Sequence, residues 1–213
     1  MTSPAQPHGH AVSPDRLRVQ LRPRGSDLPT DTLVRRYDSN FDIAVVTAHD
    51  GGLVDLTVDQ AATWDMPADE IGKLAVRQTI LEELTEVDTR DHTSANGMST
   101  RVIAHDGNPF VNVVLMSLER FTPGEASHGA LVAIPKFSAV ILHEVRSRDV
   151  LQFLVPFSGA VQSMYDDSGD SFSTDVYWWV ARRYHRVRIE RHGDERAQVH
   201  LPDALREVVA QLG

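Results

Sequence analysis

Histidines beside acidic residues are the side chains of this sequence whose types could carry catalysis. They occur at four places: His49 and Asp50, His105 and Asp106, His143 and Glu144, and a group of Asp88, Asp91 and His92. Imidazole and carboxylate groups held together can bind a metal ion or act as a general base. Adjacent residues on a strand point to opposite faces, however, and no His-Glu-x-x-His spacing occurs. We therefore expect no catalytic, cofactor-binding or metal-binding residues here, and no enzyme activity.

An acidic turn at residues 166–170 (DDSGD) is a second possible cation site. Calcium prefers several carboxylate oxygens around a tight glycine turn. The turn lacks both the alternating oxygen ligands and the distant glutamate of a calcium loop, so the sequence favours a plain surface turn. Gly-x-Ser-x-Gly, Gly-Lys phosphate loops and Gly-x-Gly-x-x-Gly are also absent from the sequence.

Residues 177–188 (YWWVARRYHRVR) have the most unusual composition, because they interleave four aromatic side chains with four arginines. Tyr, Trp and Arg dominate binding hot spots, and the same mixture suits stacking on single-stranded nucleic acid. If this segment binds a partner, one indole should be accessible beside the arginines. On a strand the two indoles face opposite ways, so we expect one ring to be buried and the other partly covered. The interaction candidates are Trp178, Trp179, Arg182, Arg183 and Arg186.

Several elements could position these residues. Residues 41–48 and 53–56 are apolar runs around an Asp-Gly-Gly turn, which predicts a β-hairpin. Thr57 and Gln60 make a capping box for a short helix, and apolar spacing predicts a second helix over 67–85. Residues 86–97 are polar and rich in turn formers, so they are predicted to be a loop.

The second half of the chain alternates between strand and helix patterns. Strands are predicted over 101–104, 130–134, 139–145, 176–180 and 186–190, and helices over 148–165 and 203–212. Residues 110–121 fit a strand or a helix, and we favour a helix. The link between 134 and 139 is too short for a helical crossover, so these two strands should be antiparallel.

This order of elements predicts an α+β fold with a mixed or mainly antiparallel sheet and helices packed on it. The length of 213 residues favours one domain, over 15–213, after a disordered N-terminal tail at 1–14 that is rich in Pro, His, Gly and Ser.

The composition limits location and partners. The chain has no cysteine, no apolar run of the roughly 18–20 residues that span a membrane and no secretory signal pattern, so we expect a cytoplasmic protein with no membrane contact. Its formal charge of −9 divides into +3 over residues 1–36, −14 over 37–176 and +2 over 177–213. The acidic body disfavours general nucleic-acid binding. All basic residues but Lys73 and Lys136 are arginines, which indicates a high-GC, bacterial coding sequence.

Three segments resemble the YtpQ-like family of uncharacterised bacterial proteins: residues 57–75 (TVDQAATWDMPADEIGKLA), 129–135 (GALVAIP) and 173–178 (STDVYW). The resemblance covers roughly residues 53–180. It implies a fold and an intracellular bacterial setting, and it implies no catalytic residue.

We therefore expect a non-enzymatic interaction or regulatory protein with a protein partner, of the antitoxin or immunity-protein kind. Two alternatives stay open: an enzyme of unrecognised type that uses the scattered His and Asp residues, and a nucleic-acid-binding module that uses residues 177–188.

Overall fold

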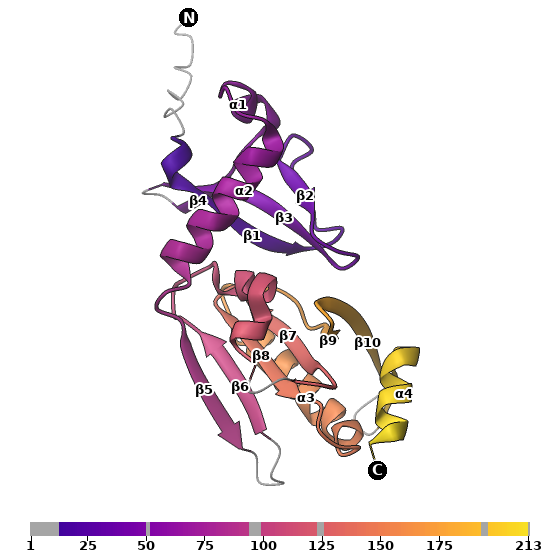
Figure 1. The fold of residues 1–213 in the computed structure, drawn as a ribbon. Helices are drawn as coiled ribbons and strands as arrows, with labels where there is room; N and C mark the ends of the chain where they lie inside the picture. The colour runs from indigo at the N-terminus through magenta and orange to yellow at the C-terminus, as the bar shows by residue number, and fades with distance from the viewer. Residues whose placement is uncertain (1–12, 50–51, 94–98, 123–125, 193–195, 213) are drawn as a thin grey trace, which may run out of the picture.

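The computed structural model describes residues 13–49, 52–93, 99–122, 126–192 and 196–212. A short 3-10 turn, Pro14–Arg16, precedes the first strand. The rest of the predicted tail, residues 1–12, lies outside the described residues. The protein has an α+β fold, as predicted, with two sheets whose described strand pairs are all antiparallel (Figure 1).

The N-terminal sheet is built around its longest strand, β3 (Phe41–His49), a β-branched segment of the kind that favours strands. β1 (Leu17–Pro23) pairs with one side of β3; β2 (Val34–Arg36) and β4 (Gly52–Asp55) pair with different stretches of the other side. The β3–β4 hairpin confirms the prediction. No strand had been predicted at β1 or β2.

Two helices follow this sheet. Thr57 and Gln60 form the predicted capping box at the start of α1 (Val58–Ala62). α2 (Ala68–Gln78) packs on β1 and continues without a break into a π-helical turn, Thr79–Glu83. The predicted helix over 67–85 is thus confirmed, with a π turn at its end.

The second sheet has seven strands in the order β11-β10-β9-β7-β8-β6-β5. The strands are β5 (Asp88–Thr93), β6 (Ser99–Ala104), β7 (Ala130–Lys136), β8 (Ala139–Glu144), β9 (Val176–Val180), β10 (Arg183–His192) and β11 (Arg196–His200). β7 and β8 are antiparallel, as predicted. The prediction of a loop over 86–97 is wrong for residues 88–93, which form the edge strand β5, and residues 94–97 lie outside the described residues.

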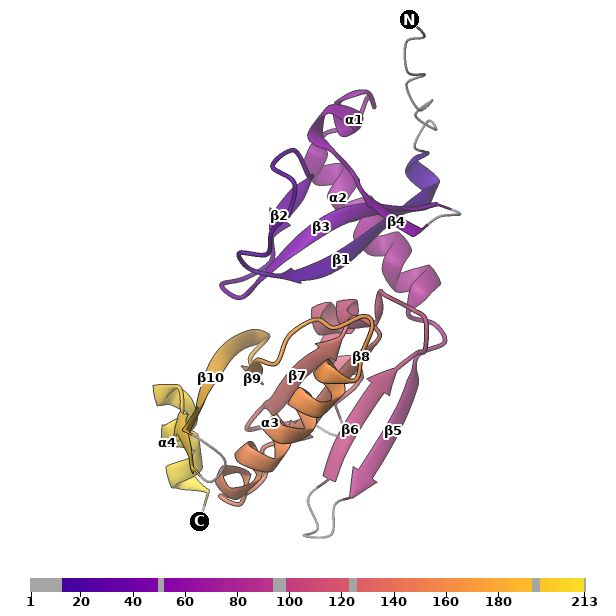
Figure 2. The ribbon, with the colours of Figure 1, turned by 180° about the vertical axis from the view of Figure 1, so that it is seen from behind.

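Helices cover both faces of this sheet. α3 (Val150–Asp166), which runs through Pro156, and α4 (Asp203–Gln211) lie on one face (Figure 2). The other face meets the 3-10 helix η3 (Val111–Arg120). Residues 110–121 are therefore helical, as favoured, but in 3-10 form, with a break at Ser117 where φ is −144°.

One apolar core joins the two sheets. It contains Leu17 and Ile43 from the N-terminal sheet, Val114 from η3, and Val132 and Trp179 from the seven-stranded sheet. A second core lies between that sheet and the helices α3 and α4. None of the helices among the described residues is long and apolar enough to cross a membrane.

Candidate functional site

The Arg-aromatic segment 177–188 forms β9, β10 and the hairpin turn between them. Trp178 is 2% exposed and Trp179 is 8% exposed, so the expectation of one partly covered ring is wrong. The two indoles do face opposite ways, but each face of the sheet is covered: Trp178 packs in the core beneath α3 and α4, and Trp179 packs in the core shared with the N-terminal sheet. Trp178 Nε1 also donates a hydrogen bond to the carbonyl of His128 at 2.9 Å.

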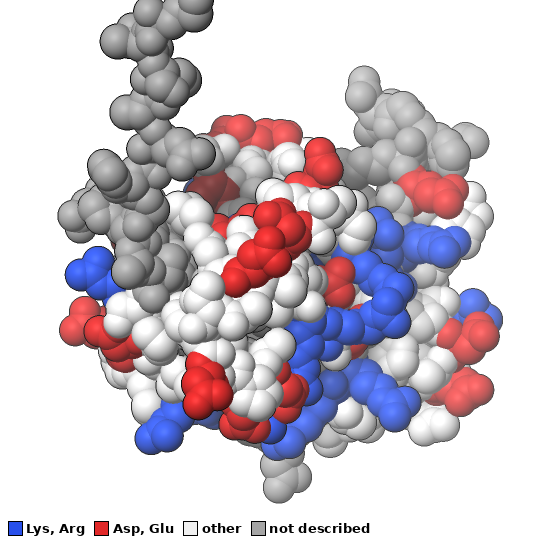
Figure 3. Space-filling view, turned by 90° about the horizontal axis from the view of Figure 1, so that it is seen from above, with Lys and Arg blue, Asp and Glu red and all other residues white. Residues whose placement is uncertain are grey.

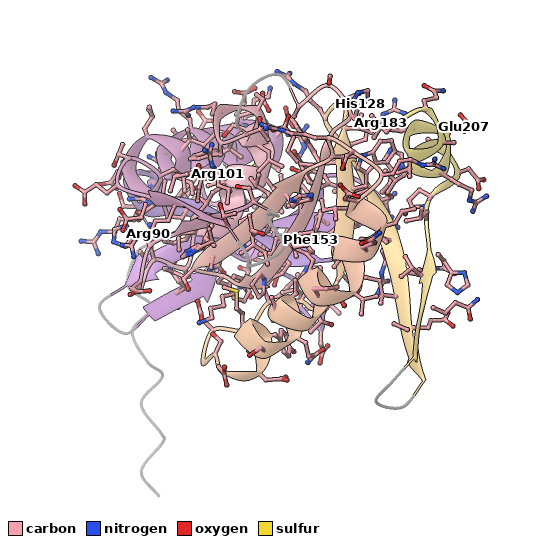
Figure 4. The ribbon with its side chains drawn as sticks, turned by 90° about the horizontal axis from the view of Figure 1, so that it is seen from below. Arg90, Arg101, His128, Phe153, Arg183 and Glu207 are labelled. Atoms are coloured by element: carbon pink, nitrogen blue, oxygen red, sulfur yellow. The ribbon has the colours of Figure 1, made fainter. Side chains whose placement is uncertain are left out.

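The arginines of this segment do not gather around an exposed ring. Arg182 pairs with Glu119 at 2.8 Å, and Arg186 pairs with Asp175 beside a polar pocket of about 590 Å³ under α3. Arg183 has no ion-pair partner among the described residues. It lies toward one end of the seven-stranded sheet, and Arg90 and Arg101 lie toward the other (Figure 4). The segment therefore lacks an accessible ring rimmed by charge.

The histidines are held by backbone groups. His105 Nδ1 lies 3.1 Å from the carbonyl of Glu86, and His143 Nδ1 lies 2.7 Å from the carbonyl of Ser99. Burial lowers the pKa of His143. The side chain of His49 lies outside the described residues. Across the described ranges, no three His, Asp or Glu side chains are placed to hold a metal ion.

The acidic residues near these histidines serve local structure. Asp91 holds Arg101 with two hydrogen bonds of 2.7 Å across the β5–β6 pair, and Asp88 pairs with Arg90. In the 166–170 turn, Asp170 accepts a hydrogen bond of 3.0 Å from the amide of Ser138. These contacts give Asp88, Asp91 and Asp170 structural roles within the fold.

A groove of about 760 Å³ lies between α2, its π turn and the strands β2 and β3, and we call it the α2–β2 groove. Six apolar side chains line it: Ile43, Val45, Val76, Ile80, Leu81 and Met116. Four basic residues line it as well: Arg35, Arg36, Lys73 and Arg77. Tyr37 and Gly72 complete the lining, which contains no acidic residue.

The floor of the α2–β2 groove is formed by alternate side chains of its strands, because every second residue of a strand points to the same face. Ile43 and Val45 are two positions apart on β3, so both point to the face that α2 partly covers. Arg35 is directly opposite Ile43 and shares that face. Its guanidinium reaches Asp69 at the start of α2, at 2.6 Å.

The π turn forms the end of the helical wall. Thr79 is fully buried, and its hydroxyl accepts a hydrogen bond from the amide of Val19 at 2.8 Å while donating to the carbonyl of Ala75. Arg18 holds the carboxylates of both Glu82 and Glu83. These contacts fix Ile80 and Leu81 at the groove, where Leu81 is 59% exposed. π-helical turns are rare in proteins overall, but those that occur are often found at functional sites.

The rim of the α2–β2 groove is cationic. Lys73 lies 2.8 Å from both Asp69 and Glu70, and its hydrogen bond lowers the pKa of Asp69. The four basic lining residues outnumber these two carboxylates by two. Arg77, which is exposed, makes no ion pair with any residue that the structure describes. Looking down onto the N-terminal sheet, Lys and Arg form a diagonal band with Asp and Glu on both sides (Figure 3).

Tyr37 lines the groove beside β2. Its hydroxyl donates to the carbonyl of Leu115 at 3.3 Å, and Tyr184 donates to the same carbonyl at 2.7 Å. Burial raises the pKa of Tyr37 to about 12.

Sequence reasoning missed this groove because it did not predict the strand β2 that completes it. The helix over 67–85 and the strand that became β3 were both predicted. β2 is three residues long and carries two arginines, so no strand pattern marks it. The sequence did contain one indication of an open apolar surface. Leu81 is an additional apolar residue on a helix that packs on the sheet through Ile71 and Ala75.

No protein-family model, curated protein or solved structure matches this chain. The resemblance to the YtpQ-like family therefore stays a prediction.

Proposed function

We propose that this chain is a non-enzymatic, cytoplasmic interaction protein that binds an acidic, partly apolar segment of a partner protein in the α2–β2 groove. One observation carries the proposal: an apolar floor is lined by four basic residues and by no acidic residue, and Asp69 and Glu70 beside the rim pair with only two of the four, Arg35 and Lys73. Complementary charge around an apolar contact gives an interface both its specificity and its rate of association.

The dimensions support binding. A volume of about 760 Å³ falls within the range of roughly 300–1,000 Å³ that is usual for ligand sites. Leu81 offers a large apolar surface that the chain itself leaves open. Met116 contributes a flexible side chain that can adapt to an apolar partner.

The same residues favour binding over catalysis. Tyr37 and Lys73 are the lining residues that could exchange protons. The pKa of Tyr37 is raised by burial, and the pKa of Lys73 is raised by its hydrogen bond to Asp69. Both groups thus stay protonated at neutral pH, and neither can act as a general base there.

Nucleic-acid binding receives less support. A net charge of −9 repels a phosphate backbone, and the groove is mostly apolar. The aromatic rings of segment 177–188 that would stack on bases are buried in the two cores.

Peptide display against the immobilised full chain tests the proposal. We expect the selected peptides to be enriched in Asp and Glu together with apolar residues. Arg77→Glu should weaken their binding by about tenfold or more, which corresponds to roughly 1.4 kcal/mol. The matched control is Arg148→Glu, which changes an exposed arginine just before α3 that likewise has no described ion pair.

Two outcomes would overturn the proposal. One is the selection of basic or purely polar peptides. The other is equal loss of binding in Arg77→Glu and Arg148→Glu, because a general charge effect would then explain the affinity.

A further inference from the structure

β2 is an edge strand at the margin of the N-terminal sheet. Among the described strands it pairs with β3 alone, and Figures 1 and 2 both place it at the outer border of the sheet. An edge strand presents unpaired amide and carbonyl groups to whatever lies beside it.

The register identifies which groups are unpaired. The amide of Tyr37 donates to the carbonyl of Phe41, and the amide of Val45 donates to the carbonyl of Leu33. Inward-bonded residues alternate with outward-facing ones along an antiparallel strand. Between Leu33 and Tyr37, the backbone groups of Val34 and Arg36 therefore point away from β3.

The α2–β2 groove extends to this edge. Arg36 is opposite Asp42 in the register, so its side chain leaves the sheet on the face away from Ile43. Arg36 nevertheless lines the groove, which places the edge of the strand at the groove's margin. A chain lying along the edge can thus direct alternate side chains over the apolar floor.

We infer that the acidic partner segment binds in extended form and adds a strand to β2. Its backbone bonds the amide and carbonyl groups of Val34 and Arg36, and every second side chain faces the α2–β2 groove. This mode of recognition takes affinity from main-chain hydrogen bonds and specificity from alternate side chains. The inference rests on the proposed function and specifies the conformation of the partner.

Charge selects a partner over a second copy of this chain. Two copies of β2 paired at their edges would bring Arg35 and Arg36 of each copy close to the same arginines of the other. Like charges across a strand pair destabilise the pair, and charged residues are a usual means of blocking edge-to-edge association. A strand that carries Glu or Asp would gain from the same arginines.

Arg36→Pro tests the inference. The substitution removes an amide of β2 that points away from β3, and it leaves the hydrogen bonds between β2 and β3 in place. Proline is accepted on edge strands where its nitrogen faces outward. The probe is a short synthetic peptide of alternating valine and glutamate with blocked ends, and binding is followed by NMR on the isotope-labelled full chain. We expect the amide signals of Val34 and Arg36 to shift on titration.

The matched control is Arg36→Ala, which keeps the amide and removes the side chain. We expect Arg36→Pro to weaken peptide binding by about tenfold and Arg36→Ala by less than about threefold. If Arg36→Pro does not fold, the backbone bonds can be blocked on the peptide instead. A version of the valine-glutamate peptide that is methylated on alternate backbone nitrogens should then no longer bind the unsubstituted protein.

The outcomes separate this inference from the proposed function. Shifts at Ile43 and Ile80 without shifts at Val34 and Arg36, or equal binding by Arg36→Pro and Arg36→Ala, would overturn strand addition and leave the groove proposal standing. The absence of shifts at all four positions would overturn both.

Discussion

Tyr37, Tyr177 and Tyr184 hold their phenolic protons more firmly than free tyrosine does. Burial is the main cause: it raises the pKa of Tyr37 to about 12 and raises the pKa of Tyr177 and Tyr184 as well. The ionised form of each ring would have to stay within the core or at its margin, where a charge is poorly solvated.

This arrangement predicts a loss of stability in alkali. The unfolded chain releases these protons near pH 10, whereas the folded chain keeps them to higher pH, so the folded state binds more protons between the two values. The free energy of unfolding should be unaffected below about pH 10 and should fall as the pH rises from about 10 towards 12. Urea unfolding from pH 8 to pH 12 measures it, with Tyr37→Phe as the variant that should show a shallower fall. A flat profile over this interval would contradict the assignment.

Single residues were only partly predictable. The alternation of a strand correctly placed Trp178 and Trp179 on opposite faces, but it could not reveal that both faces are covered. Gly129 illustrates a second limit: its φ is +78°, and a Cβ there would lie 2.2 Å from the carbonyl oxygen of Trp179 and 2.7 Å from Trp178 Nε1. The sequence contains 13 glycines, and nothing local distinguishes this one.

Among the elements, the β9–β10 hairpin has an unusual turn. Ala181 and Arg182 are its two turn residues, with φ of 47° and 61°. Two-residue hairpin turns of this shape strongly favour Asn and Gly, because other side chains crowd the backbone at positive φ. No Asn-Gly or Asp-Gly marks the position, and so the turn could not be predicted.

Replacing Ala181 with Asn should therefore stabilise the protein, by about 0.5–1 kcal/mol, since Asn tolerates the left-handed conformation better. The substitution leaves the Arg182–Glu119 ion pair in place. Ala181→Val is the opposing control and should destabilise the protein, because a β-branched side chain fits poorly at positive φ. Urea unfolding of the three proteins gives the order, and an unchanged midpoint in Ala181→Asn would show that the turn is not strained.

Elements with a strong apolar repeat were predicted, and polar edge elements were not. α2 buries side chains at helical spacing, and β7 and β8 are nearly continuous buried apolar runs, so both kinds of pattern are visible in the sequence. All six side chains of β5 are exposed, and the strand exists through its pairing with β6 and the hold of Asp91 on Arg101. Such contacts join residues about ten positions apart, which a local pattern cannot report.

At the scale of the whole molecule, a shared core connects the two sheets. β1 and β3 contribute one side of it, β7 and β9 the other, and η3 fills the space between them. α2 and η3 also pack against β1, so the apolar face of the N-terminal sheet is covered by helices as well as by the seven-stranded sheet. The α+β class followed from the mixture of strands and helices with short links, but the division into two sheets did not, since β1 and β2 were not foreseen.

A shared core predicts that the chain unfolds in one cooperative step. The sequence contains three tryptophans. In a Trp64→Phe variant, the remaining indoles are Trp178, which reports on the core under α3 and α4, and Trp179, which reports on the core shared by the two sheets. Their fluorescence and the far-UV circular dichroism should give the same urea midpoint, and the calorimetric and van't Hoff enthalpies should agree. Two separated transitions would mean that the sheets belong to independent domains.

The π turn at 79–83 also has a genetic meaning. A π-helical turn accommodates more residues than an α-helical one, so this segment can be regarded as a helix that has gained a codon. Deleting one codon within the turn would restore a regular helix and leave the residues beyond it close to their present direction around the axis, because the π turn is what absorbs the extra residue. In a regular α-helix the same deletion would rotate all that follows by about 100° around the axis. The π turn is therefore the place on this helix where the loss of one codon should disturb the Arg18 contacts and the groove wall least.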